Sequence, residues 1–374
     1  MIVTCKRQTL QNAVLNVSRA VSSKSSIPAL EGILFKAKNG QIFLCGYDLE
    51  IGITTSIDAD VIEEGDVIFG SKLFGDIIRS LPNDEVTIKV DSKYTAHIIS
   101  GSSEFHIIGI AASEYPDLPS VSGGSSLHMP QNVLKSMIRQ TLFAVAVTNT
   151  KPVHTGTLFQ LKDGCLRLVS VDGCRLAMRT EFAAYQSEAE FVVPGKTLSE
   201  VLKLIGDDTD TPVAIGIGRR HIVFTVENSE NSRYSVISRL LDGEFLKYEQ
   251  TIPNNCVTDI TVSTRRFIQA VERMSLVVNE RMKSPVTCTI TDMDMKFSCE
   301  TAIGCATDSF EIKNEGESLE IGYSDRYMLD ALRATESDEV RIQISGPVSP
   351  IKILPKEGDS FLFLVLPVRL KSKS

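Results

Sequence analysis

Few residues of this 374-residue chain have the types and spacing that catalysis would need. The segment 216–221, GIGRRH, resembles the start of a dinucleotide-binding fingerprint, but the flanking alternation of apolar residues predicts two strands joined by a hairpin. The segment 172–175, DGCR, places a thiol beside an acid, yet no general base lies near in sequence to activate that thiol. We therefore expect no catalytic residue in either segment.

Metal-binding patterns are also missing from the sequence. The carboxylate pairs Asp207-Asp208 and Glu63-Glu64 lie in polar, loop-like stretches, and no P-loop or HExxH motif occurs. The five histidines lack the spacing of a metal site; they are at positions 97, 106, 128, 154 and 221. The eight cysteines form no CxxC pair, and most lie in apolar runs where a reduced thiol acts as a small hydrophobe. The sequence predicts no metal and no cofactor.

Composition indicates an ordinary globular protein rather than a membrane protein or a strongly basic DNA binder. Hydrophobic residues make up 43% of the chain and charged residues 23%, with a net charge of −8. No stretch approaches the roughly 20 apolar residues that span a bilayer. The first residues read as a strand rather than a signal peptide. We expect a cytoplasmic, nucleoid-associated protein of two or three domains with no membrane partner.

A threefold repeat organises the chain. Helix-period stretches at 8–21, 131–146 and 264–278 are each followed by strand-like runs and by a second helical stretch; the second stretches are at 72–81, 196–205 and 325–334. Gly32 and Gly156 are 124 residues apart, and so are Asp48 and Asp172. The repeats predict domains at 1–122, 126–253 and 254–374, the first two separated by the flexible sequence SGGSS.

The fold class that follows is α+β. Short turns such as Asn39-Gly40 and Asp163-Gly164 connect successive strand-like runs, which is typical of antiparallel sheets. Each repeat should therefore hold antiparallel sheets and two amphipathic helices.

Positive charge is concentrated in the helical stretches. The windows 8–22, 72–81, 131–146, 196–205, 264–280 and 325–334 together hold 12 lysines or arginines and 6 acidic residues, a net charge of +6. The rest of the chain must then carry −14. The second helix of each repeat places base, acid and base at i, i+4 and i+7, on one helical face. Such faces could be ordinary solvated surfaces, or they could form a modest field for phosphates.

Short motifs in this order resemble those of the bacterial β sliding clamp, the processivity subunit of DNA polymerase III. The resemblance covers essentially the whole chain. Its motifs are SIPALEG (26–32), GYDLE (46–50), EYPDL (114–118), SVDGCRL (170–176), GEF (243–245) and LPVRL (366–370). Each is weak alone, and together within a threefold repeat they are specific.

The resemblance implies a non-catalytic protein that forms a closed ring around duplex DNA. Two chains would join head to tail, domain 3 of one meeting domain 1 of the next. Matching positions place Leu276 and Val277 at this junction, facing an edge strand with Phe105 and Ile107; the alternative for all four is ordinary core packing. The residues expected to face the DNA backbone without base readout are Lys24, Lys72, Arg79, Lys135, Arg139, Lys196, Lys203, Arg266 and Arg273. Lys24 follows from the resemblance, the others mainly from the helix pattern.

The resemblance also implies a pocket between domains 2 and 3 that binds short linear peptides. Partners of the family are the replicative DNA polymerase catalytic subunit, the clamp loader, translesion polymerases, mismatch-repair proteins and ligase. The matching positions are His154, Val171, Gly173, Cys174, Arg175, Leu176, Leu246, Met282, Tyr327, Val348, Leu364, Leu366, Pro367, Val368 and Arg369. Val171, Leu176 and Val348 could instead be core residues. Cys174, Leu246 and Met282 depart from the residues common in the family, which affects partner preference.

Three other functions compete with this interpretation. Trimeric clamps of archaea and eukaryotes have two repeats per chain, and three are present here. An enzyme would need an acid and base pair or a metal motif, and neither appears. A non-catalytic repeat scaffold that binds only proteins remains the alternative, and it predicts no loading onto DNA.

Overall fold

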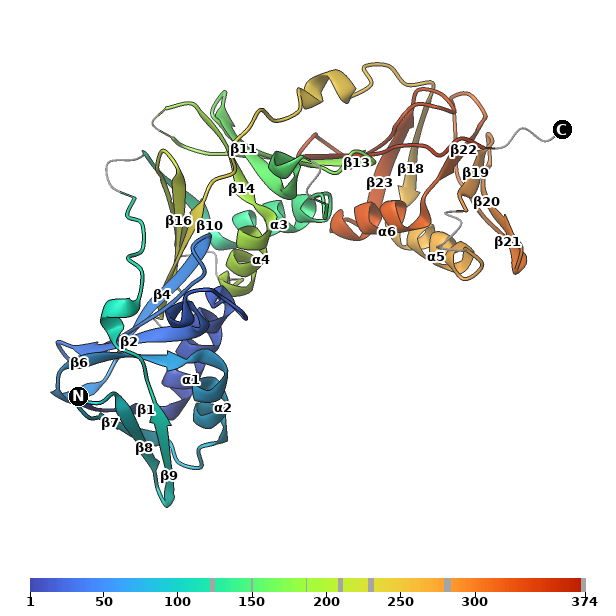
Figure 1. Cartoon of the computed structure of the whole chain (residues 1–374). Helices are drawn as coiled ribbons and strands as arrows, with labels where there is room; N and C mark the ends of the chain where they lie inside the picture. The colour runs from blue at the N-terminus through green and yellow to red at the C-terminus, as the bar shows by residue number, and fades with distance from the viewer. Residues whose placement is uncertain are drawn as a thin grey trace. The chain divides into compact units, whose positions relative to one another are not determined.

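The computed structural model describes residues 1–121, 125–148, 151–185, 187–207, 211–227, 232–278 and 284–370 (Figure 1). These form two compact units: unit 1 comprises residues 1–135 and 196–240, and unit 2 comprises residues 136–195 and 241–374. The middle repeat contributes to both units. Of the expected linker, residues 122–124 lie outside the described residues, while Ser125 and Ser126 begin a strand.

Unit 1 contains two antiparallel sheets. The first has five strands, in the order β5 (Asp60–Glu63), β1 (Ile2–Lys6), β7 (Glu85–Val90), β8 (Thr95–Ser100) and β9 (Ser103–Ile108). The second has eight strands, in the order β10 (Ser125–Pro130), β15 (Pro212–Ile217), β16 (His221–Glu227), β17 (Arg233–Arg239), β4 (Ile51–Asp58), β3 (Gln41–Tyr47), β2 (Gly32–Lys38) and β6 (Gly65–Gly70). The pairing of β17 with β4 joins strands of the second repeat to strands of the first.

Unit 2 repeats this plan with an eight-stranded and a four-stranded antiparallel sheet. The larger sheet has the order β14 (Ala189–Pro194), β11 (Gly156–Lys162), β12 (Cys165–Val171), β13 (Arg175–Phe182), β25 (Phe361–Val365), β24 (Ile351–Pro355), β23 (Glu339–Ile344) and β18 (Thr258–Ser263). The smaller has the order β21 (Gly304–Glu311), β20 (Asp294–Thr301), β19 (Val286–Ile290) and β22 (Leu319–Tyr323). Here β13 and β25 join the second repeat to the third.

Six α-helices lie in the described residues, two in each repeat as expected. They are α1 (Arg7–Val17), α2 (Ser71–Ser80), α3 (Gln131–Leu142), α4 (Gly195–Leu204), α5 (Thr264–Ser275) and α6 (Asp325–Ala334). In unit 1, α1 and α2 are neighbours, and in unit 2, α5 and α6 are neighbours (Figure 1). Among the described residues, no helix combines the length and apolar composition needed to span a bilayer.

Apolar spacing sets the buried face of each helix, as α5 illustrates. Its buried residues Phe267, Ala270, Val271 and Met274 follow i, i+3, i+4 and i+7 spacing. The Ser263 hydroxyl accepts a hydrogen bond from the Arg266 amide and caps the helix start. The expected helix 131–146 ends earlier, at Leu142, and 264–278 ends at Ser275.

Two tight turns confirm the hairpins that the sequence indicated. Asn39 and Gly40 have φ of 52° and 75°, and Asp163 and Gly164 have φ of 53° and 74°. Two consecutive residues with positive φ are the signature of the turn whose twist matches paired strands. Segment 216–221 likewise joins β15 to β16 rather than opening a helix.

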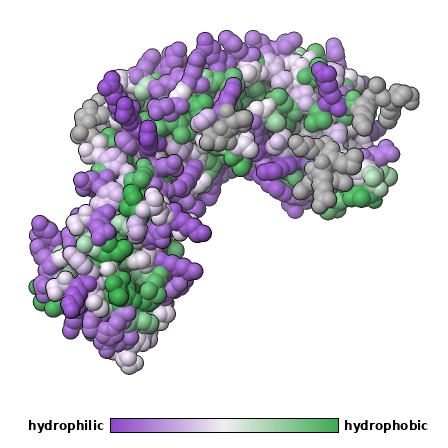
Figure 2. Space-filling view, viewed as in Figure 1, coloured by the Kyte–Doolittle hydropathy of each residue, from purple (hydrophilic) through white to green (hydrophobic). Residues whose placement is uncertain are grey.

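Hydrophilic residues cover much of the visible surface, with patches of hydrophobic residues between them (Figure 2). Beneath the surface of unit 1, Phe69 of β6 and Phe74 of α2 stack with ring centroids 4.5 Å apart, and Phe35 of β2 meets both edge-on. This aromatic cluster fixes α2 against its sheet and leaves the opposite, charged face of the helix exposed.

Candidate functional site

The basic residues expected to face DNA lie mostly on exposed helix surfaces. Eight of the nine belong to α2, α3, α4 and α5, and Lys24 lies in the segment after α1. Those with exposed side chains are Lys24, Lys72, Arg79, Arg139, Lys196, Lys203, Arg266 and Arg273. Lys135 differs, because its side chain is only 13% exposed and its Nζ lies 2.7 Å from Asp207 Oδ1. Lys135 is thus less available than its helix position indicated.

Acidic partners neutralise several of these bases. Within helices, Arg79 pairs with Asp76 at 3.2 Å and Lys203 with Glu200 at 2.8 Å. Partners from other elements are Glu336 for Arg139, Asp48 for Lys196 and Asp308 for Arg273. In the part of the chain that the structure describes, the side chains of Lys24, Lys72 and Arg266 have no ion pair. Exposed ion pairs contribute at most about 1 kcal/mol each, so a phosphate can compete for the paired bases.

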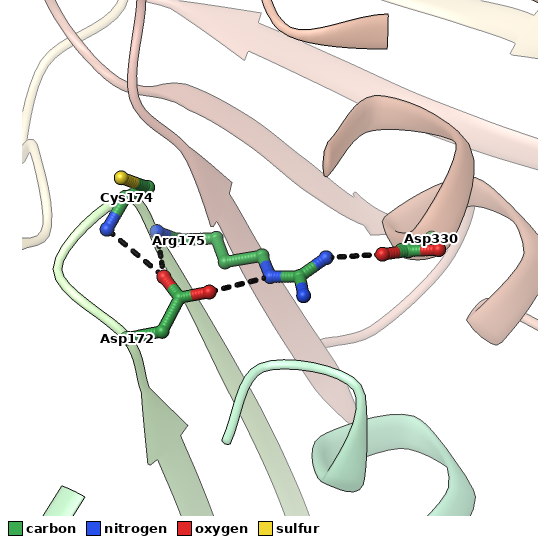
Figure 3. A network of polar contacts seen from close by, with 4 residues as sticks. All are labelled: Asp172, Cys174, Arg175 and Asp330. Atoms are coloured by element: carbon green, nitrogen blue, oxygen red, sulfur yellow. Dashed lines mark hydrogen bonds and ion pairs between the residues drawn. The ribbon is translucent and has the colours of Figure 1, made fainter. Parts of the chain in front are cut away.

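The turn between β12 and β13 is held by one aspartate. Asp172 Oδ1 accepts hydrogen bonds from the amides of Cys174 (2.9 Å) and Arg175 (3.0 Å), as Figure 3 shows. Gly173 has a φ of +87°, which favours glycine. In the first repeat, Asp48 does the same for the amides of Glu50 and Ile51. The register of 124 residues therefore marks a turn that the first two repeats share.

Arg175 connects this turn to α6. Its Nε donates to Asp172 Oδ2 at 2.9 Å and its Nη1 donates to Asp330 Oδ2 at 2.5 Å (Figure 3). The guanidinium lies 4.8 Å from the ring centre of Tyr327 and 5.4 Å from that of Phe143. The residue is only 6% exposed. Arg175 therefore links the β12–β13 turn to α6.

A pocket of about 440 Å³ opens beside this network in unit 2. Its lining comprises Cys174, Val278, Ser284, Ser324, Asp325, Arg326, Tyr327 and Val368. The segment after β25 forms one side, since the Leu366 amide donates to the Cys174 carbonyl and the Val368 amide donates to the Gly322 carbonyl. A pocket of this volume, lined by both apolar and polar side chains, can hold a few side chains of an extended peptide.

The expected pocket residues lie in several different environments, and one of them, Arg175, belongs to the network with Asp172 and Asp330. Cys174, Tyr327 and Val368 line the pocket together. Val171, Leu176 and Leu364 are buried in an apolar cluster that also contains Phe245. The ring of His154, which is partly buried, lies 5.5 Å from that of Phe245. Exposed or partly exposed residues outside these contacts are Gly173, Leu246, Val348, Leu366, Pro367 and Arg369. Met282 lies outside the described residues.

Three of these positions bear on the alternative that they are ordinary core residues. Val171 and Leu176 are 3% exposed, as core residues would be, whereas Val348 is 72% exposed and is not a core residue. A large exposed aliphatic side chain is available for contact with a partner.

Burial sets the charge of the titratable residues near the pocket. It raises the pKa of Tyr327, and the neighbouring Cys174 adds to the rise. It lowers the pKa of His154, with Lys151 adding to the effect. Both side chains are therefore neutral at pH 7. The positive charge of the pocket wall comes from the exposed Arg326.

The residues expected at the junction between two chains lie on the edge strand of a sheet and directly after a helix. Phe105 and Ile107 are on β9, the edge strand of the five-stranded sheet, and Ile107 is buried on its own sheet. Leu276 follows α5 and is 80% exposed, while Val277 packs partly against the core of unit 2. An exposed leucine and an unpaired edge strand are each features that association between chains would cover.

The sequence interpretation missed several residues of this site. In the sequence, Asp330 stood out only as the acid of the base–acid–base face in the stretch 325–334. Phe143 was only one residue of the helical stretch 131–146. Val278, Ser324, Asp325 and Arg326 were not selected, although α6 belonged to the repeat pattern. The positions of Arg326 and Asp330 within the base–acid–base pattern of α6 were the available signals.

Comparisons with known proteins cover nearly the whole chain. Residues 1–119, 128–247 and 249–369 match families described as the N-terminal, central and C-terminal domains of the DNA polymerase III beta subunit. The beta sliding clamp of Bacillus subtilis is 32% identical, covering 99% of this chain and 100% of that protein. A crystal structure of the Bacillus subtilis DNA polymerase sliding clamp superposes with a TM-score of 0.94 at 31% identity, covering 99% of this chain and all of that one.

A third comparison agrees. The crystal structure of a putative DNA polymerase III beta subunit from Eubacterium rectale has a TM-score of 0.93 at 33% identity, again over 99% of this chain and all of the other. The chain belongs to the DNA polymerase III beta subunit family, the sliding clamps. It has the three clamp domains that the repeat predicted.

Proposed function

We propose that this chain is a non-catalytic clamp that forms a closed homodimeric ring around duplex DNA and tethers the replicative polymerase. The observation that carries the proposal is the full-length match to the three beta-subunit domains. The domains are proposed to span 1–122, 126–253 and 254–374. A ring is retained by its topology, so strong binding to DNA is unnecessary.

The charge distribution supports this proposal. Exposed bases recur on helices of every repeat, and most have an acidic partner nearby, so the field at these helices is modest. Phosphate contacts of this kind are independent of sequence and sensitive to salt. A modest field allows sliding, whereas many unpaired bases would hold the ring at one place.

Retention on circular and linear DNA tests the ring. The full chain is loaded onto a nicked circular plasmid with a clamp loader and ATP, and half of the sample is then linearised. We expect retention on circles and rapid loss from linear DNA. Equal, salt-sensitive binding to both forms would identify an ordinary DNA binder, and no loading on either form would favour the scaffold that binds only proteins.

We further propose that the pocket beside Arg175 binds short linear peptides of polymerases, the clamp loader and repair proteins. Its support is the pocket of about 440 Å³ between the Cys174 turn, α6 and the segment containing Val368. Aliphatic and aromatic peptide side chains would occupy the pocket, and the exposed Val348 and Leu366 would extend the contact.

Two exposed cysteines of unit 2 provide a matched test of this pocket. Cys174 lines it, whereas Cys256 lies in the described loop before β18. In fluorescence anisotropy with a short peptide carrying leucine and phenylalanine, Cys174→Glu should weaken binding by at least about tenfold. Cys256→Glu should bind like the unaltered chain. Equal affinity for both variants would place the peptide elsewhere.

A further inference from the structure

The β8–β9 hairpin of unit 1 gathers three potential metal ligands. His97 and His106 are directly opposite each other in the antiparallel register, and Glu104 lies two residues before His106. The ring centroids of His97 and His106 are 4.0 Å apart, and the ring planes meet at 70°. The Glu104 carboxylate oxygen Oε1 lies 3.7 Å from His97 Nδ1 and 3.4 Å from His106 Nε2. The two histidines are nine positions apart in sequence, so only strand pairing reveals the cluster.

The hairpin geometry explains why the imidazoles are so close. Gly101 and Ser102 form a two-residue turn, which makes Ser100 and Ser103 the hydrogen-bonded pair that closes it. Pair types alternate along an antiparallel ladder, so His97 and His106 form a non-hydrogen-bonded pair. In such pairs the side chains approach most closely.

We propose that His97 Nδ1, His106 Nε2 and Glu104 Oε1 form a binding site for a divalent first-row transition metal ion, with Zn²⁺ the best fit. The three ligand atoms lie within 4.8 Å of one another. Zn–N and Zn–O bonds near 2.0–2.1 Å at a tetrahedral centre separate ligand atoms by about 3.3 Å. The two distances to the carboxylate already approach this value, and side-chain rotation can close the remaining gap between the nitrogens.

The chemistry of the donors selects the class of ion. Two imidazole nitrogens suit Zn²⁺, Cu²⁺ or Ni²⁺, whereas Mg²⁺ and Ca²⁺ prefer oxygen ligands throughout. Glu104 and His106 are exposed and His97 is partly exposed, so an ion could reach them and keep a water in the fourth position.

The site occupies the opposite face of β9 from the residues expected at the chain junction. Side chains alternate along a strand, so Phe105 and Ile107 point away from Glu104 and His106. A bound ion would link β8 to the edge strand through side chains without covering Phe105 or Ile107. It would therefore stabilise the hairpin that carries these residues.

Titration of the full chain without a histidine tag tests the site. Calorimetry with Zn²⁺ should show one binding event that is weakened at least about tenfold by His106→Gln and by His97→Gln. Mg²⁺ should not bind there. His128→Gln is the matched control, because His128 is also an exposed strand histidine, on β10, and its loss should leave Zn²⁺ affinity unchanged.

The exposed thiols of the chain are the competing ligands, and Co²⁺ distinguishes them. Cobalt bound by imidazole and carboxylate gives no thiolate charge-transfer band, whereas cobalt on Cys174, Cys256 or Cys305 does. A thiolate band, or equal Zn²⁺ affinity in His106→Gln and His128→Gln, would overturn the proposal. Circular dichroism of the variants would show that the fold is retained.

Discussion

Replacing Arg175 by alanine should destabilise unit 2 more than any exposed charge substitution. The side chain is 6% exposed and donates to two carboxylates from different repeats, Asp172 and Asp330. Alanine leaves both carboxylates without their cation. The side chains of Asp172 and Asp330 are only 15% and 32% exposed, so water replaces the lost partner incompletely.

The size of the effect follows from these contacts. Each hydrogen bond to a charged group contributes about 1.5–3 kcal/mol, which gives about 3–6 kcal/mol for two. Solvent reaching Asp330 reduces its share, and a value of about 3–4 kcal/mol agrees with the range for breaking a buried pair. Arg175→Lys should lose less, because the charge remains, although one ammonium cannot reproduce the planar fork that bridges both carboxylates.

Urea unfolding followed by circular dichroism measures the loss. At ordinary urea sensitivities, about 3 kcal/mol shifts the midpoint of the unit 2 transition by about 1 M or more. Lys313→Ala is the control, because its ion pair with Glu315 is almost fully exposed and its loss should leave the midpoint unchanged. An Arg175→Ala midpoint within about 0.3 M of the unaltered chain would refute the claim that Arg175 holds the two repeats.

Three further predictions concern DNA, association and the thiols. The double variant Lys72→Glu, Arg266→Glu should reduce the salt dependence of binding to duplex DNA. The slope of log K against log salt concentration should fall by about one for each phosphate contact that is lost. An unchanged slope would remove both residues from the DNA-facing set. Leu276→Asp should convert a dimer into monomers in analytical ultracentrifugation, because association would bury the new charge, and a persistent dimer would place the junction elsewhere. Iodoacetamide at pH 8 should label the exposed Cys174 in the native protein but not Cys45. Burial raises the pKa of Cys45 to about 12, so little of its thiol is ionised at pH 8. Mass spectrometry that shows equal labelling of both cysteines would contradict the burial of Cys45.

The elements of the fold were predictable because their signals are local. The spacing of Phe267, Val271 and Met274 requires only that one helix face be apolar, and these residues are buried as expected. Asn39-Gly40 identifies its turn because two residues alone must adopt positive φ. Helix ends were less accurate, since the apolar pattern of 131–146 continues past Leu142, where the helix stops.

Partners of charged side chains were only partly predictable. The base–acid–base pattern indicated pairs within one helix, and Arg79–Asp76 is such a pair. In the third repeat, however, Arg333 pairs with Glu272 of α5 and Asp330 receives Arg175. Which acid meets which base depends on how elements pack, and long side chains can reach several neighbours.

By itself, the sequence determined the repeat, the helices, the hairpin turns and the family, because each depends on the order of residues along the chain. Only the tertiary structure decided the pocket wall, the Asp172–Arg175–Asp330 network and the His97–Glu104–His106 cluster. These features join residues far apart in sequence, or on opposite strands, at distances of a few ångströms. Their formation depends on strand register and helix packing, which no local pattern of residue types specifies.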